Sequence, residues 1–225
     1  DSQNIINRVS IDSRDVDEHT LFFAIKGERF DGHDFVKDVA EKGVGAIVCH
    51  KKVECDAPVI YVKDTKDALL DLASYYKDTF SDLLLIALTG SVGKTTTKEM
   101  IHAVMSSKYN TLKNEGNLNN EIGVPLTLFR LDSTHEAAVI EMGMNHFDEI
   151  HNLSLTALPD VAVITNVGTS HIENLGSREG ILKAKLEILD GLDKDGLLVL
   201  NGDNDLLGGL KDLPAKSVFY GLCEK

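Results

Sequence analysis

The strongest constraint on the fold is an apolar run that leads directly into a glycine-rich loop and then into a helix-forming stretch. The segment Leu85–Met100 reads LIALTGSVGKTTTKEM. Gly90 and Gly93 allow a tight turn whose N–H groups point inward at phosphate oxygens. The N-terminus of the following helix adds a favourable dipole. In such a loop Lys94 reaches the β- and γ-phosphates, and the Thr95 hydroxyl ligates Mg²⁺.

The loop departs from the usual GxxxxGK[ST] spacing, because Leu88 stands where the first glycine of that pattern would fall. It has the shorter form TG-S-x-GKT. The alternative is a glycine turn with a surface lysine, but the strand before the loop and the helix after it favour a phosphate site. The predicted ATP-binding residues are Gly90, Ser91, Val92, Gly93, Lys94, Thr95 and Thr96.

Short β-branched runs alternate with helical patterns along the chain, which is typical of an α/β protein. Near-continuous apolar runs such as Leu83–Leu88 and Ala137–Met142 predict buried parallel strands. We expect two domains that meet near Ser81: residues 1–81 as a small α/β domain, and residues 82–225 as a mostly parallel, doubly wound domain. Predicted helices cover Phe35–Lys42, Thr65–Phe80, Thr95–Ser107, Ile122–Arg130 and Glu179–Leu192.

Charge and cysteine usage narrow the partners. The chain has 23 Lys and Arg against 36 Asp and Glu, a net charge of −13, which disfavours nucleic acid as a partner. No apolar run approaches the ~18–20 residues that cross a bilayer. The three cysteines, Cys49, Cys55 and Cys223, form no CxxC pair and are expected to be reduced thiols of a cytoplasmic protein.

Further candidate residues follow other predicted strands at the edge where ligands bind in such sheets. Glu141 ends the run AAVIE, and a carboxylate there can hold Mg²⁺. His171 follows VAVITNVG by a few residues. Lys183 and Lys185 lie in GILKAKLEIL, where lysines on a helix are usually solvated. The Asn-rich run Asn114–Leu126 offers uncharged donors and acceptors, Asn117, Asn119 and Asn120, or forms an ordinary polar turn.

These segments, in this order, resemble the central domain of the Mur ligase family: TGSVGKTTTKEM, NEGNLNNEIGVPL, EMGMNH, TNVGTSHIENLGS and EGILKAKLEI. The resemblance covers residues 83–192. In the first domain, IDSRDV and LFFAIKGERFDGHDFV are similar to the family's UDP-substrate domain. Within the family, the Asn-rich run, MGMNHFDEI and GSREGI look like the branch that joins D-alanyl-D-alanine to UDP-N-acetylmuramoyl-tripeptide in peptidoglycan synthesis, and hence in cell-wall biogenesis, cell shape and division.

The resemblance implies an ADP-forming ligase that proceeds through an acyl phosphate. Lys94, Lys185 and His171 are its expected catalytic residues. Thr95 and Glu141 would hold one Mg²⁺ with ATP, and His171 would contribute to a second. Lys185 matches the family lysine that CO₂ carbamylates, and Lys183 is the competing candidate. The positions that match those expected near the substrate are Ser13, Arg14, Lys26, Gly27, Asp31, Gly32 and His33, with Asn117, Asn119 and Asn120 in the central domain.

The family also has a third, C-terminal domain, for which these 225 residues contain no counterpart. We therefore expect the central domain to be incomplete and this chain alone to be an inactive monomer. The alternatives are a branch that adds a diamino acid, a folylpolyglutamate synthetase, or a non-catalytic nucleotide-binding module. The DSR…GHDF segment argues against the folate enzyme. Retention of Lys94, Glu141 and Lys185 argues against a decayed module.

Overall fold

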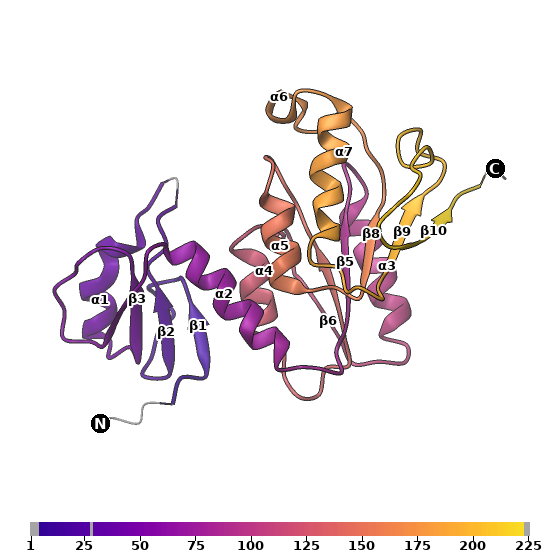
Figure 1. Ribbon diagram of the computed structural model, residues 1–225. Coiled ribbons are helices and arrows are strands. Elements are labelled where there is room, and N and C mark those ends of the chain that lie inside the picture. The colour runs from indigo at the N-terminus through magenta and orange to yellow at the C-terminus, as the bar shows by residue number, and fades with distance from the viewer. Residues whose placement is uncertain (1–4, 28, 223–225) are drawn as a thin grey trace. The chain divides into compact units, whose positions relative to one another are not determined.

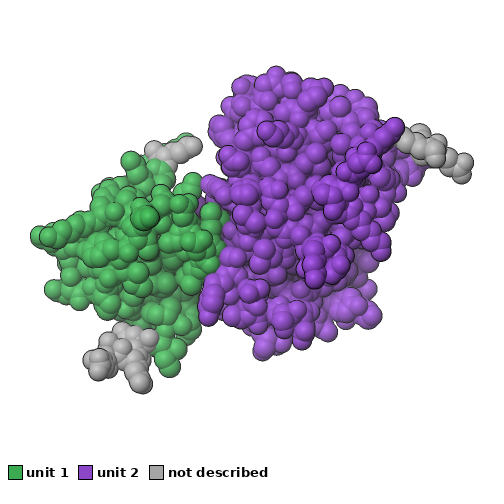
Figure 2. All heavy atoms as spheres, in the orientation of Figure 1, with its two compact units in different colours: residues 1–72 green, residues 73–225 purple. Residues whose placement is uncertain are grey.

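The computed structural model describes residues 5–27 and 29–222. The chain forms two compact units, residues 1–72 and 73–225 (Figure 2). Each unit contains its own sheet, and the named strands of both sheets pair in parallel (Figure 1). The α/β class with parallel sheets is thereby confirmed. Cys223 lies outside the described residues.

The first unit is built on a four-stranded sheet of order β1-β2-β3-β4. Its core includes Phe22, Val39 and Ile47, each with 0% of its surface exposed. The elements are β1 (Arg8–Ser10), β2 (Thr20–Phe23), the 3-10 helix η1 (Gly32–Phe35), α1 (Val36–Glu41), β3 (Ala46–Cys49), β4 (Val59–Tyr61) and the start of α2 (Thr65–Asp78).

The second unit is built on a six-stranded sheet of order β10-β9-β8-β5-β7-β6. Its strands are β5 (Leu84–Thr89), β6 (Thr111–Lys113), β7 (Ala137–Glu141), β8 (Val161–Ile164), β9 (Leu197–Asn201) and β10 (Lys216–Tyr220). Its helices after α2 are α3 (Lys94–Met105), α4 (Gly123–Leu128), α5 (Glu149–Ala157), α6 (Ile172–Leu175), α7 (Arg178–Leu186) and the 3-10 helix η2 (Glu187–Leu189).

The central strands of this sheet are buried because helices cover both of their faces. All five residues of β7 and five of the six in β5 are buried, as their apolar runs predict. Right-handed crossovers place α3 on one face and α4, α5 and α7 on the other. In agreement, α3 contacts β6 and β7, while α5 contacts both α4 and α7 (Figure 1).

The division between the units falls within α2, nine residues before the predicted boundary near Ser81. The last turns of this helix pack in the second unit through side-chain hydrogen bonds. Tyr76 Oη donates to the Leu131 carbonyl at 2.7 Å, and Lys77 Nζ donates to the Leu158 carbonyl at 3.0 Å. Sequence periodicity identifies the helix but does not show which of its turns belongs to which core.

Several predicted bounds were wrong. The helix predicted for Glu179–Leu192 ends at Leu186 and continues as η2. Five elements had no predicted range: β1, η1, β6, α5 and α6. Two of them are three-residue strands, too short for a period-2 pattern. Helix α5, EIHNLSLTA, contains several weak helix formers, and tertiary burial stabilises it. None of the described helices combines the length and apolarity that a membrane crossing requires.

Because β7 is fully buried, shortening one of its side chains should lower the stability of the fold considerably. Ile140→Ala should lower the unfolding free energy by about 2–5 kcal/mol, because a cavity would replace packed atoms. The surface change Val104→Ala, at a side chain that is 72% exposed, should stay within about 0.5 kcal/mol. The unfolding free energies of both variants can be measured from the hydrogen exchange of peptides covering residues 137–142 at increasing urea concentrations. Equal effects would contradict this account of the core.

Candidate functional site

The candidate site lies at the carboxyl edge of the six-stranded sheet. Strand β5 ends at Thr89, the phosphate loop follows over residues 90–93, and α3 begins at Lys94. β7 and β8 flank β5, with Leu88 opposite Glu141 and Thr89 opposite Ile164. The chain leaves β5 toward one side of the sheet and later returns to its other side, so β5 lies at the topological switch point where ligands bind in such folds.

Two glycines of the loop are required for different reasons. A Cβ on Gly90 would lie 1.9 Å from Thr165 Oγ1, so the backbone passes too close to β8's continuation for any side chain. Gly93 has a φ of +76° and stands immediately before α3, in a conformation that glycine adopts without strain. Together they let the loop turn sharply into the helix.

The amide of Asn166 holds the first half of the phosphate loop. Its Oδ1 accepts hydrogen bonds from the N–H groups of Ser91 and Val92, both at 3.0 Å, and its Nδ2 donates to the Val92 carbonyl at 2.9 Å. Gly168 N–H donates to Ser91 Oγ at 2.9 Å. The N–H groups of the first turn of α3 have no partner within the helix and therefore remain available for an anion.

Two lysines from different elements meet beside this loop. Lys94 Nζ donates to the Gly90 carbonyl at 3.0 Å. Lys185, on α7, is only 2% exposed. Burial, with the nearby charge of Lys94, lowers the pKa of Lys185 to about 7. Lys183 is exposed instead, with its ammonium 5.6 Å from the centre of the Phe147 ring. Of the two candidate lysines, Lys185 is therefore the one that is buried near the phosphate loop.

Glu141 is a buried carboxylate with one unoccupied oxygen. It is 2% exposed, and its Oε1 accepts a hydrogen bond from Asn119 Nδ2 at 2.8 Å. Its Oε2 and the buried hydroxyl of Thr89 have no hydrogen-bond partner among the described residues. Orphaned buried oxygens of this kind need a partner, and carboxylate and hydroxyl oxygens are ligands that suit Mg²⁺. These two oxygens fit a site for this cation.

The other residues predicted to bind the metal or the nucleotide are exposed or lack side-chain hydrogen bonds. Thr95 and Thr96 are exposed in the first turn of α3. His171 precedes α6 with a φ of +64°, and its ring makes no hydrogen bond within the described part of the chain. No cluster of three or more His, Cys, Asp or Glu side chains suited to a metal occurs among residues 5–27 and 29–222. A cation here would therefore depend on hydroxyl groups, nucleotide phosphates and water as well as Glu141.

The three predicted asparagines have three different surroundings. Asn119 holds Glu141, as described above. Asn120 Oδ1 accepts hydrogen bonds from the N–H groups of Ile122 and Gly123 at 3.2 and 2.9 Å, and so holds the turn that leads into α4. The side chain of Asn117 is exposed. Of the three side chains, only that of Asn117 makes no hydrogen bond within the described residues, and its backbone carbonyl accepts the Asn119 N–H at 2.8 Å.

In the first unit, Asp31 and His33 form a closed internal pair. His33 is buried, and its Nδ1 lies 2.7 Å from Asp31 Oδ1. Its Nε2 accepts the backbone N–H of His50 at 3.2 Å, so the ring proton is on Nδ1. Lys51 and the His33 N–H hold the pKa of Asp31 well below its usual range. Both ring nitrogens of His33 are therefore engaged within the protein.

The remaining predicted substrate residues lie around loops. The Ser13 carbonyl accepts from Lys42 Nζ at 2.7 Å, and Arg14 forms an ion pair with Asp12. Lys26 pairs with Asp31 in an isolated antiparallel bridge. The Gly27 N–H donates to the Phe30 carbonyl at 2.9 Å. A Cβ on Gly32 would lie 2.8 Å from the Ile25 nitrogen, so only glycine fits there.

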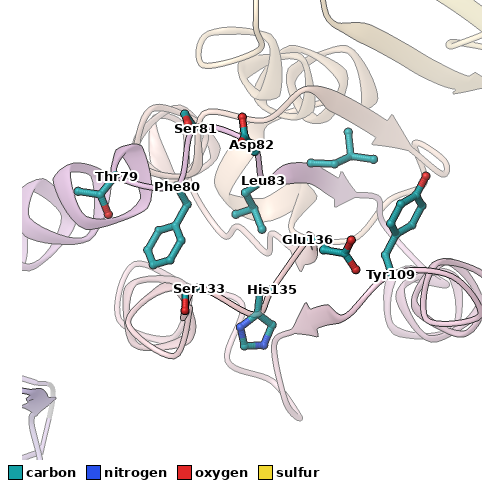
Figure 3. Close-up of a pocket in the computed structure, with 10 residues that line it drawn as sticks. Thr79, Phe80, Ser81, Asp82, Leu83, Tyr109, Ser133, His135 and Glu136 are labelled. Carbon is teal, nitrogen blue, oxygen red and sulfur yellow. The ribbon is translucent and has the colours of Figure 1, made fainter.

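A pocket of about 500 Å³ lies elsewhere in the second unit, at the amino ends of the strands (Figure 3). Leu83 and Glu136, which line it, immediately precede β5 and β7. Tyr109 and His135 add polar groups to its wall. The phosphate loop is at the opposite, carboxyl edge of the same sheet, so this pocket is not the candidate site.

Sequence reasoning missed Asn166, Asn114, Thr89 and Lys98. Asn166 and Thr89 stand at or just beyond strand ends, a position that by itself marks the ligand-binding edge. Lys98 follows Lys94 by four residues on α3, so the two share a helix face. These positional signals could have identified the three residues.

The lowered pKa of Lys185 predicts a pH dependence. Between pH 7 and its ordinary pKa of 10.5, the unfolded chain binds a proton at this residue that the folded chain does not. The unfolding free energy should therefore rise with pH over this range, by at most about 1.4 kcal/mol per unit. Lys185→Met should be more stable than wild type near pH 7, and this advantage should shrink toward pH 10. Urea denaturation in CO₂-free buffers measures it, and a constant difference would contradict the burial of an amine.

Comparison with known proteins agrees with this geometry. Residues 88–225 match the family model described as Mur ligase middle domain, and residues 5–77 match the one described as Mur ligase family, catalytic domain. The chain is 49% identical to the UDP-N-acetylmuramoyl-tripeptide--D-alanyl-D-alanine ligase of Bacillus subtilis (strain 168), over 91% of this chain and 45% of that protein. It therefore spans less than half the length of this relative.

Solved structures give the same picture. The crystal structure of MurF from Acinetobacter baumannii is similar with a TM-score of 0.91 and 38% identity, over 95% of this chain and 48% of that one. MurF ligase from Thermotoga maritima in complex with ADP is similar with a TM-score of 0.90 and 33% identity, over 98% and 52%. With both units matched by its family models and its fold shared with these ligases, the chain belongs to the Mur ligase family.

Proposed function

We propose that this chain supplies the UDP-substrate and ATP-binding parts of an ADP-forming ligase that joins D-alanyl-D-alanine to UDP-N-acetylmuramoyl-tripeptide. The observation that carries the proposal is that Lys94 and Lys185 lie close enough for their charges to interact, while Glu141 stands opposite Leu88 at the end of β5, just before the phosphate loop. The Bacillus subtilis relative carries these two substrates in its name. In this proposal, residues 1–81 bind the UDP-linked substrate and residues 82–225 bind ATP.

The chemistry requires two anions to approach each other. A carboxylate oxygen of the tripeptide attacks the γ-phosphorus of ATP, ADP leaves, and an acyl phosphate forms. The amine of D-alanyl-D-alanine then attacks the acyl carbon, loses a proton and expels inorganic phosphate. Lys94 and the N–H groups of α3 stabilise the negative charge on the transferring phosphoryl group. The fixed loop conformation, held by Asn166, orients these donors before ATP arrives.

Glu141 and Thr95 are the residues that would hold Mg²⁺ with the ATP phosphates, and His171 would contribute to a second ion. A bound Mg²⁺ supplies charge neutralisation at the phosphate oxygens. Glu141 presents a single free oxygen because Asn119 occupies the other.

Lys185 is the proposed site of carbamylation. Its pKa of about 7 leaves much of the amine neutral at neutral pH, and a neutral amine is the form that attacks CO₂. The attack forms an N–C bond and releases one proton, leaving a carbamate anion. That anion would pair with Lys94 and replace the repulsion between two ammonium groups.

Nucleotide binding tests the ATP role. Lys94→Ala should raise the Kd for ADP in the presence of Mg²⁺ by about 10- to 100-fold, because a hydrogen bond to a charged phosphate is lost. Lys94→Arg should not restore affinity, because a planar guanidinium cannot replace a compact ammonium. Lys108→Ala, an exposed lysine beyond the end of α3, is the matched control. Isothermal titration calorimetry supplies the values, and wild-type affinity in Lys94→Ala would refute the role.

Carbamylation is tested directly by ¹³C NMR with ¹³C-bicarbonate. Wild type and Lys183→Met should each show one slowly exchanging carbamate carbon that grows in as the pH is raised through 7. Lys185→Met should not show it. A signal lost in Lys183→Met and kept in Lys185→Met would transfer the assignment to the exposed lysine.

The substrate role is tested separately by titration with UDP-N-acetylmuramoyl-tripeptide. Binding of the tripeptide substrate in preference to the dipeptide one supports the D-alanyl-D-alanine branch, whereas preference for the dipeptide substrate would favour the diamino-acid branch. Failure to bind either, with nucleotide binding intact, would favour a nucleotide-binding module. A cytoplasmic location is part of the proposal, because ATP is the co-substrate and Cys49 and Cys55 are free thiols.

A further inference from the structure

Lys98 is a buried cation that the proposed chemistry does not use. It lies on α3, and only 1% of its surface is exposed. Its Nζ donates to the Asn114 carbonyl at 2.7 Å and lies 3.5 Å from Glu99 Oε1. Burial of an ammonium group costs free energy unless its partners compensate. An apolar side chain at this position would avoid that cost, so the contact with Asn114 calls for an explanation.

Asn114 joins the end of β6 to the end of β7. It is fully buried, and its side chain pairs with the backbone of Glu141 in both directions. Asn114 Nδ2 donates to the Glu141 carbonyl at 3.0 Å, and Asn114 Oδ1 accepts the Glu141 N–H at 3.0 Å. The same Nδ2 donates to the Leu118 carbonyl at 2.9 Å. The side-chain amide of Asn114 therefore holds the backbone of Glu141 in the way that a paired residue of a neighbouring strand would.

This series of hydrogen bonds, from Lys98 through Asn114, continues to the carboxylate of Glu141. The Leu118 carbonyl that Asn114 holds immediately precedes Asn119, whose Nδ2 donates to Glu141 Oε1 at 2.8 Å. The Asn119 carbonyl in turn accepts the Gly143 N–H at 2.7 Å. Glu141 is thus held by its backbone and by one oxygen, and its Oε2 alone is unpaired.

We propose that Lys98 is a positioning residue for the Glu141 carboxylate. By holding the Asn114 carbonyl, Lys98 fixes the amide that orients Glu141, so that Oε2 faces the cation bound with the nucleotide phosphates. Lys98 itself does not touch the nucleotide. This inference rests on the proposed function, because it requires Mg²⁺ and nucleotide to share the site. Loss of the hydrogen bond from Lys98 would leave the Asn114 carbonyl without a buried donor. The Glu141 carboxylate would then be free to adopt other orientations.

The test compares ADP affinity with and without Mg²⁺ by calorimetry. Lys98→Met keeps the side-chain length but removes the donor. The gain in ADP affinity on adding Mg²⁺ should fall about 10- to 100-fold, as for other residues that orient metal ligands. Metal-free ADP affinity should stay within about twofold of wild type. In a Glu141→Gln background, Lys98→Met should produce no further loss, because its effect passes through Glu141.

Lys77→Met is the matched control. Lys77 is also a partly buried lysine that donates to a backbone carbonyl, that of Leu158 at 3.0 Å, but at the amino edge of the same sheet. It should lower stability without changing the Mg²⁺ effect, which separates positioning from general support of the fold. Asn114→Ala removes the next link and should reproduce the Lys98→Met result, and it carries the test if Lys98→Met does not fold.

Two negative outcomes are distinguishable. An unchanged Mg²⁺ effect in a folded Lys98→Met or Asn114→Ala variant overturns the positioning role alone. Failure of wild type to bind ADP, with or without Mg²⁺, refutes the proposed function, and the positioning role falls with it.

Discussion

The candidate site depends on the pairing between the phosphate loop and the segment that follows β8. Asn166 bonds to both the N–H and carbonyl groups of the loop, and the loop can approach it because Gly90 has no side chain. The segment that follows β8 is itself held by two side chains from other elements. Arg178 Nη2 donates to the Val167 carbonyl at 2.9 Å, and Asn201 Nδ2 donates to the Thr165 carbonyl at 3.0 Å. The conformation of the loop is therefore fixed by hydrogen bonds within the protein.

Electrostatics within the site oppose those of the whole chain. The net charge of −13 repels a nucleotide at long range, and salt reduces that repulsion beyond about 8–10 Å. At short range the ammonium group of Lys94 would attract a phosphate in the proposed complex, whereas burial lowers the pKa of Lys185 to about 7 and leaves much of that amine neutral at neutral pH. In the proposed function, the fixed donors of the phosphate loop would let an acidic protein select a phosphorylated ligand despite its repulsive exterior.

Local patterns in the sequence predicted much of this arrangement. The apolar runs identified β5 and β7, and the loop residues and Glu141 were placed correctly at the carboxyl edge because parallel strands share that edge. The contacts of Asn166 could not be predicted, because they join residues 74 and 75 positions apart. The burial of Lys98 was missed because lysine is rarely fully buried. The roles assigned to His171 and to the substrate residues stay predictions.

The contact between Lys94 and the Gly90 carbonyl has a thermodynamic consequence. The ammonium group already has an acceptor at 3.0 Å, so a phosphate bound there, as proposed, would share the three N–H donors of this group with the Gly90 carbonyl. An ammonium group whose charge is already partly satisfied gains less from a second acceptor, and the measured affinity would reflect that smaller gain. A variant loop that left the lysine without this internal acceptor would bind nucleotide more tightly while gaining no new contact.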